Sequence, residues 1–219
     1  RTEYSVMNTT VAFLAQTLAI FMGFFTRVVF TRTLSEGYVG INGLFTDILN
    51  ILSLSELGVG TAITYALYTP IARRDIKKQQ ILMRMFRNFY RITAGFVLLA
   101  GLCLIPFLDI LMKDRPDVTH LIIIYLLYLL NSVVSYLLIY KKTLVDAHQM
   151  NYITVMYHNG FLVLQDILQI MVLFLTRNFI LFLVIAVVCT IIGNICMSRK
   201  ADRLFPYLKE PCKEQLPQE

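Results

Sequence analysis

The sequence has little charge and few of the features that build soluble enzymes. Only 16% of its 219 residues are charged and Trp is absent, whereas hydrophobic residues make up 57% and the mean hydropathy is +0.65. Soluble domains carry roughly a quarter charged residues. This composition therefore excludes a disordered chain, a nucleic-acid-binding domain and almost any soluble enzyme. It indicates a membrane protein.

Motifs that mark common catalytic chemistry are also missing. The sequence contains no G-x-x-x-x-G-K-[ST] phosphate loop, no H-E-x-x-H metal motif and no G-x-S-x-G nucleophile turn. The three His lack metal-ligand spacing, and the four Cys form no disulfide framework because three of them lie inside apolar runs. We therefore expect neither an enzyme nor a cofactor or metal site.

Long apolar runs dominate what is present. A membrane-spanning helix needs about 20 mostly apolar residues, and six stretches meet this length. The predicted spans are Asn8–Phe30, Tyr38–Tyr68, Arg91–Met112, Thr119–Tyr140, Ile153–Thr176 and Phe179–Met197. The second is long enough to tilt or break. We expect an all-α, polytopic six-helix bundle over residues 1–204, followed by a polar linker over residues 205–219.

The distribution of positive charge predicts the orientation of this bundle. Most of the 20 Lys and Arg fall at the N-terminus, between the second and third spans, after the fourth span or after the sixth. Cytoplasmic connections are enriched in Lys and Arg. Both ends are therefore expected in the cytoplasm, and the net charge of +6 is mainly a topological signal.

Polar side chains recur at helical spacing inside the second span. Asn42, Thr46, Asn50, Ser53 and Glu56 follow one another at steps of three or four residues, so a helix would place them on one face. Polar groups in the bilayer are costly unless they face a bundle interior or water. Such a stripe could be a helix–helix contact, but two Asn and a Glu favour the wall of a polar cavity.

Other spans carry shorter polar faces that would meet the same cavity. In the first span, Gln16 and Arg27 share a face, although Arg27 lies near the outer end and could instead reach the membrane interface. The fifth span places Gln165 and Gln169 together, and the fourth offers Asn131. These residues complete the predicted substrate cavity.

Two acidic residues near the middle of predicted spans are candidates for ion coupling. Glu56 and Asp166 would each have to be protonated, paired or hydrated at that depth. Proton coupling needs such a group, and so does a buried structural hydrogen bond. Both interpretations stay open.

The segment that enters the third span is a basic amphipathic helix. Lys77, Arg84, Arg87 and Arg91 lie on one face, with apolar residues on another. Contact with anionic lipid headgroups explains this pattern. A sharper alternative is that some of these residues steer a diphosphate-bearing lipid toward the cavity, because the planar guanidinium of Arg donates two hydrogen bonds to phosphate.

Several segments together resemble a known family. They are Arg32–Phe45 (RTLSEGYVGINGLF), Leu52–Ala72 (LSLSELGVGTAITYALYTPIA), Ser135–Leu137, Thr143–Ile153 (TLVDAHQMNYI) and Leu204–Leu208 (LFPYL). The chain resembles polysaccharide flippases of the O-antigen and capsule type, within the multidrug/oligosaccharidyl-lipid/polysaccharide exporter superfamily. The S-E-L-G-x-G segment with the downstream L-Y-x-P-I is the more specific part of this resemblance.

The resemblance implies two pseudo-symmetric six-helix lobes that work by alternating access, of which this chain is the first. It implies the translocation of an undecaprenyl-diphosphate-linked oligosaccharide across the bacterial cytoplasmic membrane. The implied partners are a C-terminal lobe, membrane lipids, and polysaccharide polymerase and glycosyltransferases. In relatives that flip the peptidoglycan precursor, cavity arginines contact the diphosphate, and Arg27 is the nearest candidate here.

Two other functions remain open from the sequence. A cation-coupled multidrug antiporter of the same superfamily would rely on acidic cavity residues and would not need Arg27. A non-transporting membrane scaffold for polysaccharide enzymes would use the polar stripes only as helix contacts.

Overall fold

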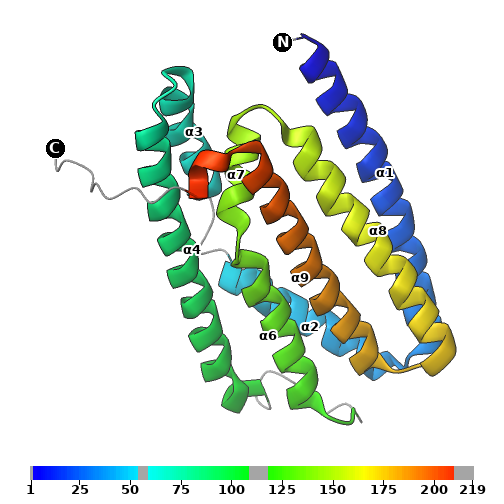
Figure 1. Cartoon of the computed structure of the whole chain (residues 1–219). Coiled ribbons are helices and arrows are strands. Elements are labelled where there is room, and N and C mark those ends of the chain that lie inside the picture. The colour runs from blue at the N-terminus through cyan, green and yellow to red at the C-terminus, as the bar shows by residue number, and fades with distance from the viewer. Residues whose placement is uncertain (1, 54–58, 109–117, 210–219) are drawn as a thin grey trace.

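The computed structural model describes residues 2–53, 59–108 and 118–209, and in these residues every regular element is a helix (Figure 1). The expected all-α class is confirmed for this part of the chain. The α-helices are α1 (Thr2–Thr33), α2 (Glu36–Ser53), α3 (Val59–Ala72), α4 (Ile76–Leu104), α6 (Leu121–Tyr136), α7 (Ile139–Ala147), α8 (Asn151–Thr176) and α9 (Phe179–Leu204). Two short 3₁₀ helices, η2 (Ile105–Phe107) and η3 (Pro206–Lys209), follow α4 and α9.

Five stretches of helix in the described residues are long and apolar enough to cross a membrane, which indicates a multi-pass membrane protein. They are Ala12–Thr33, Ile76–Phe107, Leu121–Ala147, Asn151–Thr176 and Phe179–Leu204. The expected second span, Tyr38–Tyr68, includes residues 54–58, which lie outside the described residues, and it stays a prediction. Its described parts are α2, which carries Asn42, Asp47 and Asn50, and α3, whose 14 residues reach about 21 Å.

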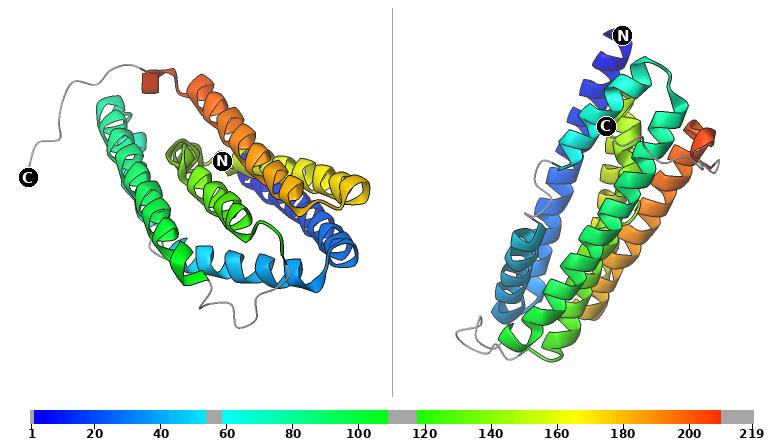
Figure 2. Two further views of the ribbon diagram at one scale, coloured as in Figure 1. Left: turned by 90° about the horizontal axis from the view of Figure 1, so that it is seen from below. Right: turned by 90° about the vertical axis from the view of Figure 1, so that its left-hand side faces the viewer.

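The long helices pack side by side in an order that differs from their order in the chain. α8 lies between α1 and α9, α9 packs on α6, and α6 packs on α4. Seen from below in Figure 2, α2 runs along one side of this layer, from the end of α1 toward α4. The short helices α3 and α7 pack together beside α4. This arrangement leaves room between α2, α6, α8 and α9.

The fourth expected span is a broken helix. α6 ends at Tyr136, Leu137 is extended, and Leu138 has a φ of 70° before α7 begins at Ile139. A left-handed backbone at a residue other than Gly costs on the order of 1–3 kcal/mol. Asn194 of α9 donates a hydrogen bond of 2.9 Å to the Val134 carbonyl next to the break. The connection expected after Tyr140 is therefore helical, since α7 continues to Ala147.

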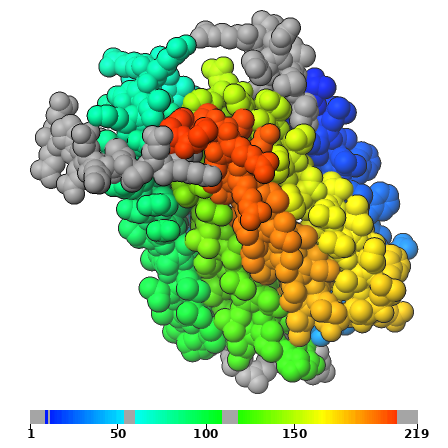
Figure 3. Space-filling model, in the orientation of Figure 1, coloured from blue at the N-terminus to red at the C-terminus, as the bar shows by residue number. Residues whose placement is uncertain are grey.

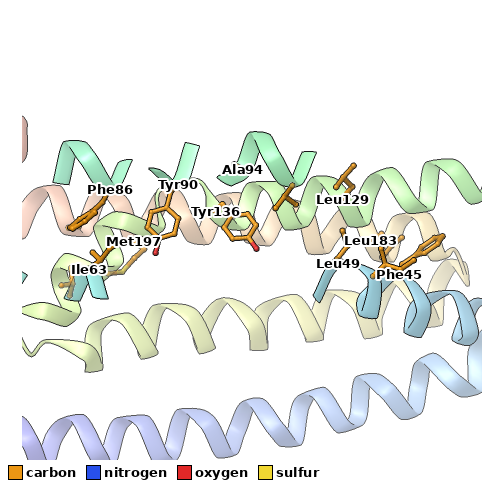
Figure 4. Packing of buried hydrophobic residues seen from close by; sticks show 14 of the residues in the cluster. Phe45, Leu49, Ile63, Phe86, Tyr90, Ala94, Leu129, Tyr136, Leu183 and Met197 are labelled. Atoms are coloured by element: carbon orange, nitrogen blue, oxygen red, sulfur yellow. The ribbon is translucent and has the colours of Figure 1, made fainter. Parts of the chain in front are cut away.

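The hydrophobic core follows α4, α6 and the inner faces of α2 and α9 (Figure 4). α4 and α6 approach closely at Gly101, where an added Cβ would meet the Leu129 side chain. The Tyr125 hydroxyl donates a hydrogen bond of 2.7 Å to the Gly101 carbonyl at the same place. A larger residue at position 101 would require the Leu129 side chain to move.

Polar contacts tie the helix ends where the basic residues collect, which we call the basic end. Lys141 of α7 forms an ion pair with Asp202 of α9 at 2.8 Å and donates to the Ser198 hydroxyl. The Tyr207 hydroxyl donates a 2.6 Å hydrogen bond to Gln79 of α4, so the first part of the expected linker is docked on the helices. Residues 210–219 of that linker lie outside the described residues.

Candidate functional site

A hollow lies between α2, the α6–α7 junction, α8 and α9. Its volume is about 570 Å³, which is in the usual range for small-molecule sites. We call it the polar chamber, because polar side chains distant in sequence meet on its wall. They are Thr46, Asn50, Ser53, Tyr128, Asn131, Ser132, Ser135, Lys142, Thr154, Tyr157, His158, Gln165, Thr190 and Asn194.

The α2 wall of the polar chamber is formed by part of the expected stripe. Thr46, Asn50 and Ser53 line it, while the opposite face of α2 is buried in the core. The two hydroxyl groups bond carbonyls of their own helix, Thr46 to Asn42 at 2.6 Å and Ser53 to Asn50 at 2.7 Å. Asn42 itself is not on the wall, because its Oδ1 accepts a hydrogen bond from Tyr128.

The α6 wall carries the expected Asn131 together with Ser132 and Ser135. Ser135 donates to the Ser132 carbonyl at 2.6 Å. The Oδ1 atom of Asn131 is buried and has no hydrogen-bond partner among the described residues. A buried acceptor without a donor costs about 1–3 kcal/mol. A solute that carries hydroxyl or amide donors would remove that cost.

On the α8 and α9 walls, only part of the expected polar face points into the polar chamber. Gln165 lines it with His158, and Thr190 and Asn194 face them from α9. Gln169 is buried elsewhere, where its Nε2 donates a 3.0 Å hydrogen bond to the Phe182 carbonyl. Gln169 therefore links α8 to α9 at the turn between them.

Lys142 contributes a cation to the polar chamber wall that the sequence analysis did not assign. It lies on α7, four residues after the break, and was expected in a loop. Lys142, Ser53 and Ile139 also line a wider, more open hollow of about 590 Å³. That hollow includes Tyr65 and Tyr68 of α3 and lies toward the basic end. The two hollows thus share part of their wall.

The polar residues of α1 lie outside the polar chamber. Gln16 and Arg27 are exposed, and the Arg27 guanidinium lies 5.6 Å from the centre of the Phe30 ring. α1 packs mainly against α8, and none of its described side chains lines the polar chamber. The helical phase that placed both residues inward did not account for this one-sided packing.

The two expected ion-coupling acids have different outcomes. Asp166 is half-buried between α8 and α1, where its Oδ1 accepts a 3.0 Å hydrogen bond from Thr26. Thr26 is buried. The sequence analysis missed it because it considered only the helix face that carries Gln16 and Arg27. Glu56 lies outside the described residues. Asp166 is not on the wall of the polar chamber.

The basic residues of α4 divide into two groups. Arg87 and Arg91 line a third hollow of about 450 Å³, whereas Lys77 and Arg84 do not; Arg87 is half-buried and the other three are exposed. We call this hollow the lateral crevice. It is lined by Arg87, Tyr90, Arg91, Val134, Tyr136, Leu137, Leu138, Tyr140, Ile191, Asn194 and Ile195. It shares Tyr136, Leu138 and Asn194 with the polar chamber.

The chemistry of the polar chamber is that of recognition by hydrogen bonds. Its amides and hydroxyls offer donors and acceptors, and among the described residues no group of three His, Cys, Asp or Glu side chains could hold a metal ion.

Comparisons of the chain with family models, with curated proteins and with solved structures find no match.

Proposed function

We propose that the chain belongs to a transporter that moves an undecaprenyl-diphosphate-linked oligosaccharide across the bacterial cytoplasmic membrane. The observation that carries this proposal is the polar chamber, in which polar faces of four helices converge within an apolar bundle. Moving sugar hydroxyls and phosphates through hydrocarbon unaided costs several kcal/mol for each unpaired group. A chamber of amides and hydroxyls lowers that cost.

In this proposal the chain is one six-helix lobe with both ends in the cytoplasm. α2 and α3 belong to the second span, and the basic end faces the cytoplasm. The oligosaccharide enters past Tyr65 and Tyr68, and Lys142 attracts the diphosphate on the way in. Asn50, Asn131 and Gln165 then bind hydroxyl groups of the sugar.

The test is surface polysaccharide synthesis by a bacterial strain that depends on the whole protein. Asn131→Leu and Gln165→Leu should each reduce the surface polysaccharide strongly, because they remove hydrogen-bonding groups from the chamber wall. Gln16→Leu is the matched control, since it makes a similar change on the exposed face of α1. Normal polysaccharide in both chamber variants would contradict the proposal.

One observation keeps the cation-coupled antiporter as a second candidate. Asp166 is a half-buried acid inside a candidate membrane span, as cation coupling requires. An antiporter predicts efflux of lipophilic cations that is lost in Asp166→Asn and kept in Arg27→Ala. Absence of such efflux in the unmodified protein would remove this candidate.

The access of water to the chamber wall distinguishes a transporter from a non-transporting scaffold. Asn50→Cys, in a chain whose own cysteines are replaced by Ser, should react with water-soluble thiol reagents because Asn50 lines an open chamber. Ile48→Cys is the control, since Ile48 is buried on the opposite face of α2. A scaffold with dry helix contacts would leave both positions unreactive.

A further inference from the structure

The lateral crevice has apolar walls and opens toward the surroundings of the bundle. α4 forms one side and α9 the other, and the floor is the break between α6 and α7. Figure 3 shows this face of the molecule, with α6 visible between α4 and α9. Leu137, Ile191 and Ile195 line the crevice and are exposed. In a membrane, such an opening faces the hydrocarbon chains of lipids.

Two arginines give this apolar crevice a charged end. Arg87 lies beside Tyr140 on this wall, and its Nε is buried without a partner among the described residues. Arg91 lies one turn further along α4, on the same crevice. Within the described residues, neither guanidinium has a carboxylate oxygen within ion-pair distance. The crevice therefore presents two guanidinium groups that form no ion pair within the described residues.

Arg87 and Arg91 also lie near the point where α4 changes from a charged to an apolar helix. The helix is rich in charge from Lys77 to Arg91 and apolar from Ile92 to Leu104, apart from Thr93. This change of character marks the boundary between the headgroup and hydrocarbon regions of a bilayer. Phosphate groups of lipids lie at that boundary, with their chains on the apolar side.

We propose that the lateral crevice binds an anionic phospholipid of the surrounding membrane. Its phosphate accepts hydrogen bonds from Arg87 and Arg91, since guanidinium groups match phosphate oxygens in pairs. One acyl chain lies along the apolar floor between α4 and α9. Basic pockets between membrane helices are suited to anionic headgroups in this way. This site lies next to the polar chamber, with which it shares three wall residues, and it does not depend on the proposed transport function.

The experiment uses the full chain reconstituted in nanodiscs of phosphatidylcholine with a minor fraction of phosphatidylglycerol. After extraction into mild detergent, native mass spectrometry counts the phosphatidylglycerol molecules that stay bound. The double variant Arg87→Gln/Arg91→Gln should retain roughly tenfold less, because each charge-assisted hydrogen bond contributes substantially to affinity. Arg199→Gln/Arg203→Gln is the matched control, because these exposed residues of α9 lie outside the crevice. It should change retention less than twofold.

A second variant tests the acyl-chain part of the site. Ile195→Trp keeps both guanidinium groups and fills the crevice, so it should also lower retention; Ile195 is exposed, which makes the larger side chain tolerable to the fold. Far-ultraviolet circular dichroism checks that each variant is folded. Retention of phosphatidylcholine and phosphatidylglycerol by the unmodified chain in the ratio at which the nanodiscs contain them would overturn the proposal. So would an equal loss in the control, or complete displacement of the lipid by inorganic phosphate, which would make the ligand a free anion.

Discussion

Helix α1 and the helices around the polar chamber carry similar polar stripes. The stripes of the chamber helices face the chamber, whereas the stripe of α1 is exposed. In α2 and α6, Asn50 and Asn131 point into the chamber. In α1, Gln16 and Arg27 are exposed. The difference lies in the neighbours, because α6 has partners on several sides whereas α1 packs mainly on α8. Helical phase tells which residues share a face, and only packing decides where that face points.

The largest effect on stability is expected at the partly buried ion pair between Lys141 and Asp202. Lys141→Met leaves the carboxylate of Asp202 half-buried and unpaired, so the free energy of unfolding should fall by about 2–3 kcal/mol. Arg27→Met on the exposed side of α1 should change it by less than about 0.5 kcal/mol. Unfolding in detergent by increasing dodecyl sulfate, followed by circular dichroism, measures both. Similar losses in the two variants would contradict the comparison.

A smaller effect is expected at the interface that α1 does make. Thr26→Val removes the hydrogen bond to Asp166 and should cost about 1–2 kcal/mol. Thr17→Val is the matched control on the same helix, because the Thr17 hydroxyl bonds only the Phe13 carbonyl of α1. The same unfolding titration applies. If Thr17→Val cost as much as Thr26→Val, the contact between α1 and α8 would carry no specific hydrogen bond.

The break between α6 and α7 predicts that Gly and Ala substitutions rank in opposite order of stability at the break and inside α6. At Leu138, whose φ is 70°, Leu138→Gly should be more stable than Leu138→Ala by about 1 kcal/mol. At Val133, inside α6, the order should reverse by a similar amount because Ala favours helix. Thermal unfolding of the four variants in detergent compares them. The same order at both positions would mean that α6 continues through the break.

The smallest expected effect concerns pH at the basic end. Burial raises the pKa of Tyr207 to about 12, so its neutral phenol stabilises the fold fully below pH 10 and this contribution is lost between pH 10 and 12. The loss should be roughly 1 kcal/mol, because the side chain is partly exposed. Tyr207→Phe should remove this part of the pH dependence. Tyr65→Phe, at an exposed residue of α3, should leave it unchanged.

Much of the helical architecture could be predicted from the sequence. Apolar run length and helical spacing predicted the all-helical class in the described residues, and most of the helix positions. They also predicted that Asn50, Asn131 and Gln165 lie on inward faces, because these residues belong to helices with neighbours on several sides. The expected second span stays a prediction, because residues 54–58 in its middle lie outside the described residues.

Other parts of the site left no signal in the sequence. Neither Gly nor Pro marks the break at Leu138, and the hydrogen bond from Asn194 to Val134 that accompanies it joins helices 60 residues apart in sequence. Lys142 was assigned to a loop because the predicted span ended at Tyr140, so its place on the chamber wall could not be found. The separation of Arg87 and Arg91 from the other basic residues of α4 likewise depends on α9, which no local pattern reveals.

Tyr136, Leu138 and Asn194 serve as a partition with a different hollow on either side. A molecule that pushes on this partition from one side changes the space on the other. By thermodynamic linkage, if a molecule in the crevice changes the affinity of the chamber by some factor, a molecule in the chamber changes the affinity of the crevice by the same factor. Any coupling through these three residues would make the affinity of the chamber for its solute depend on the lipid in the crevice, without direct contact between the two.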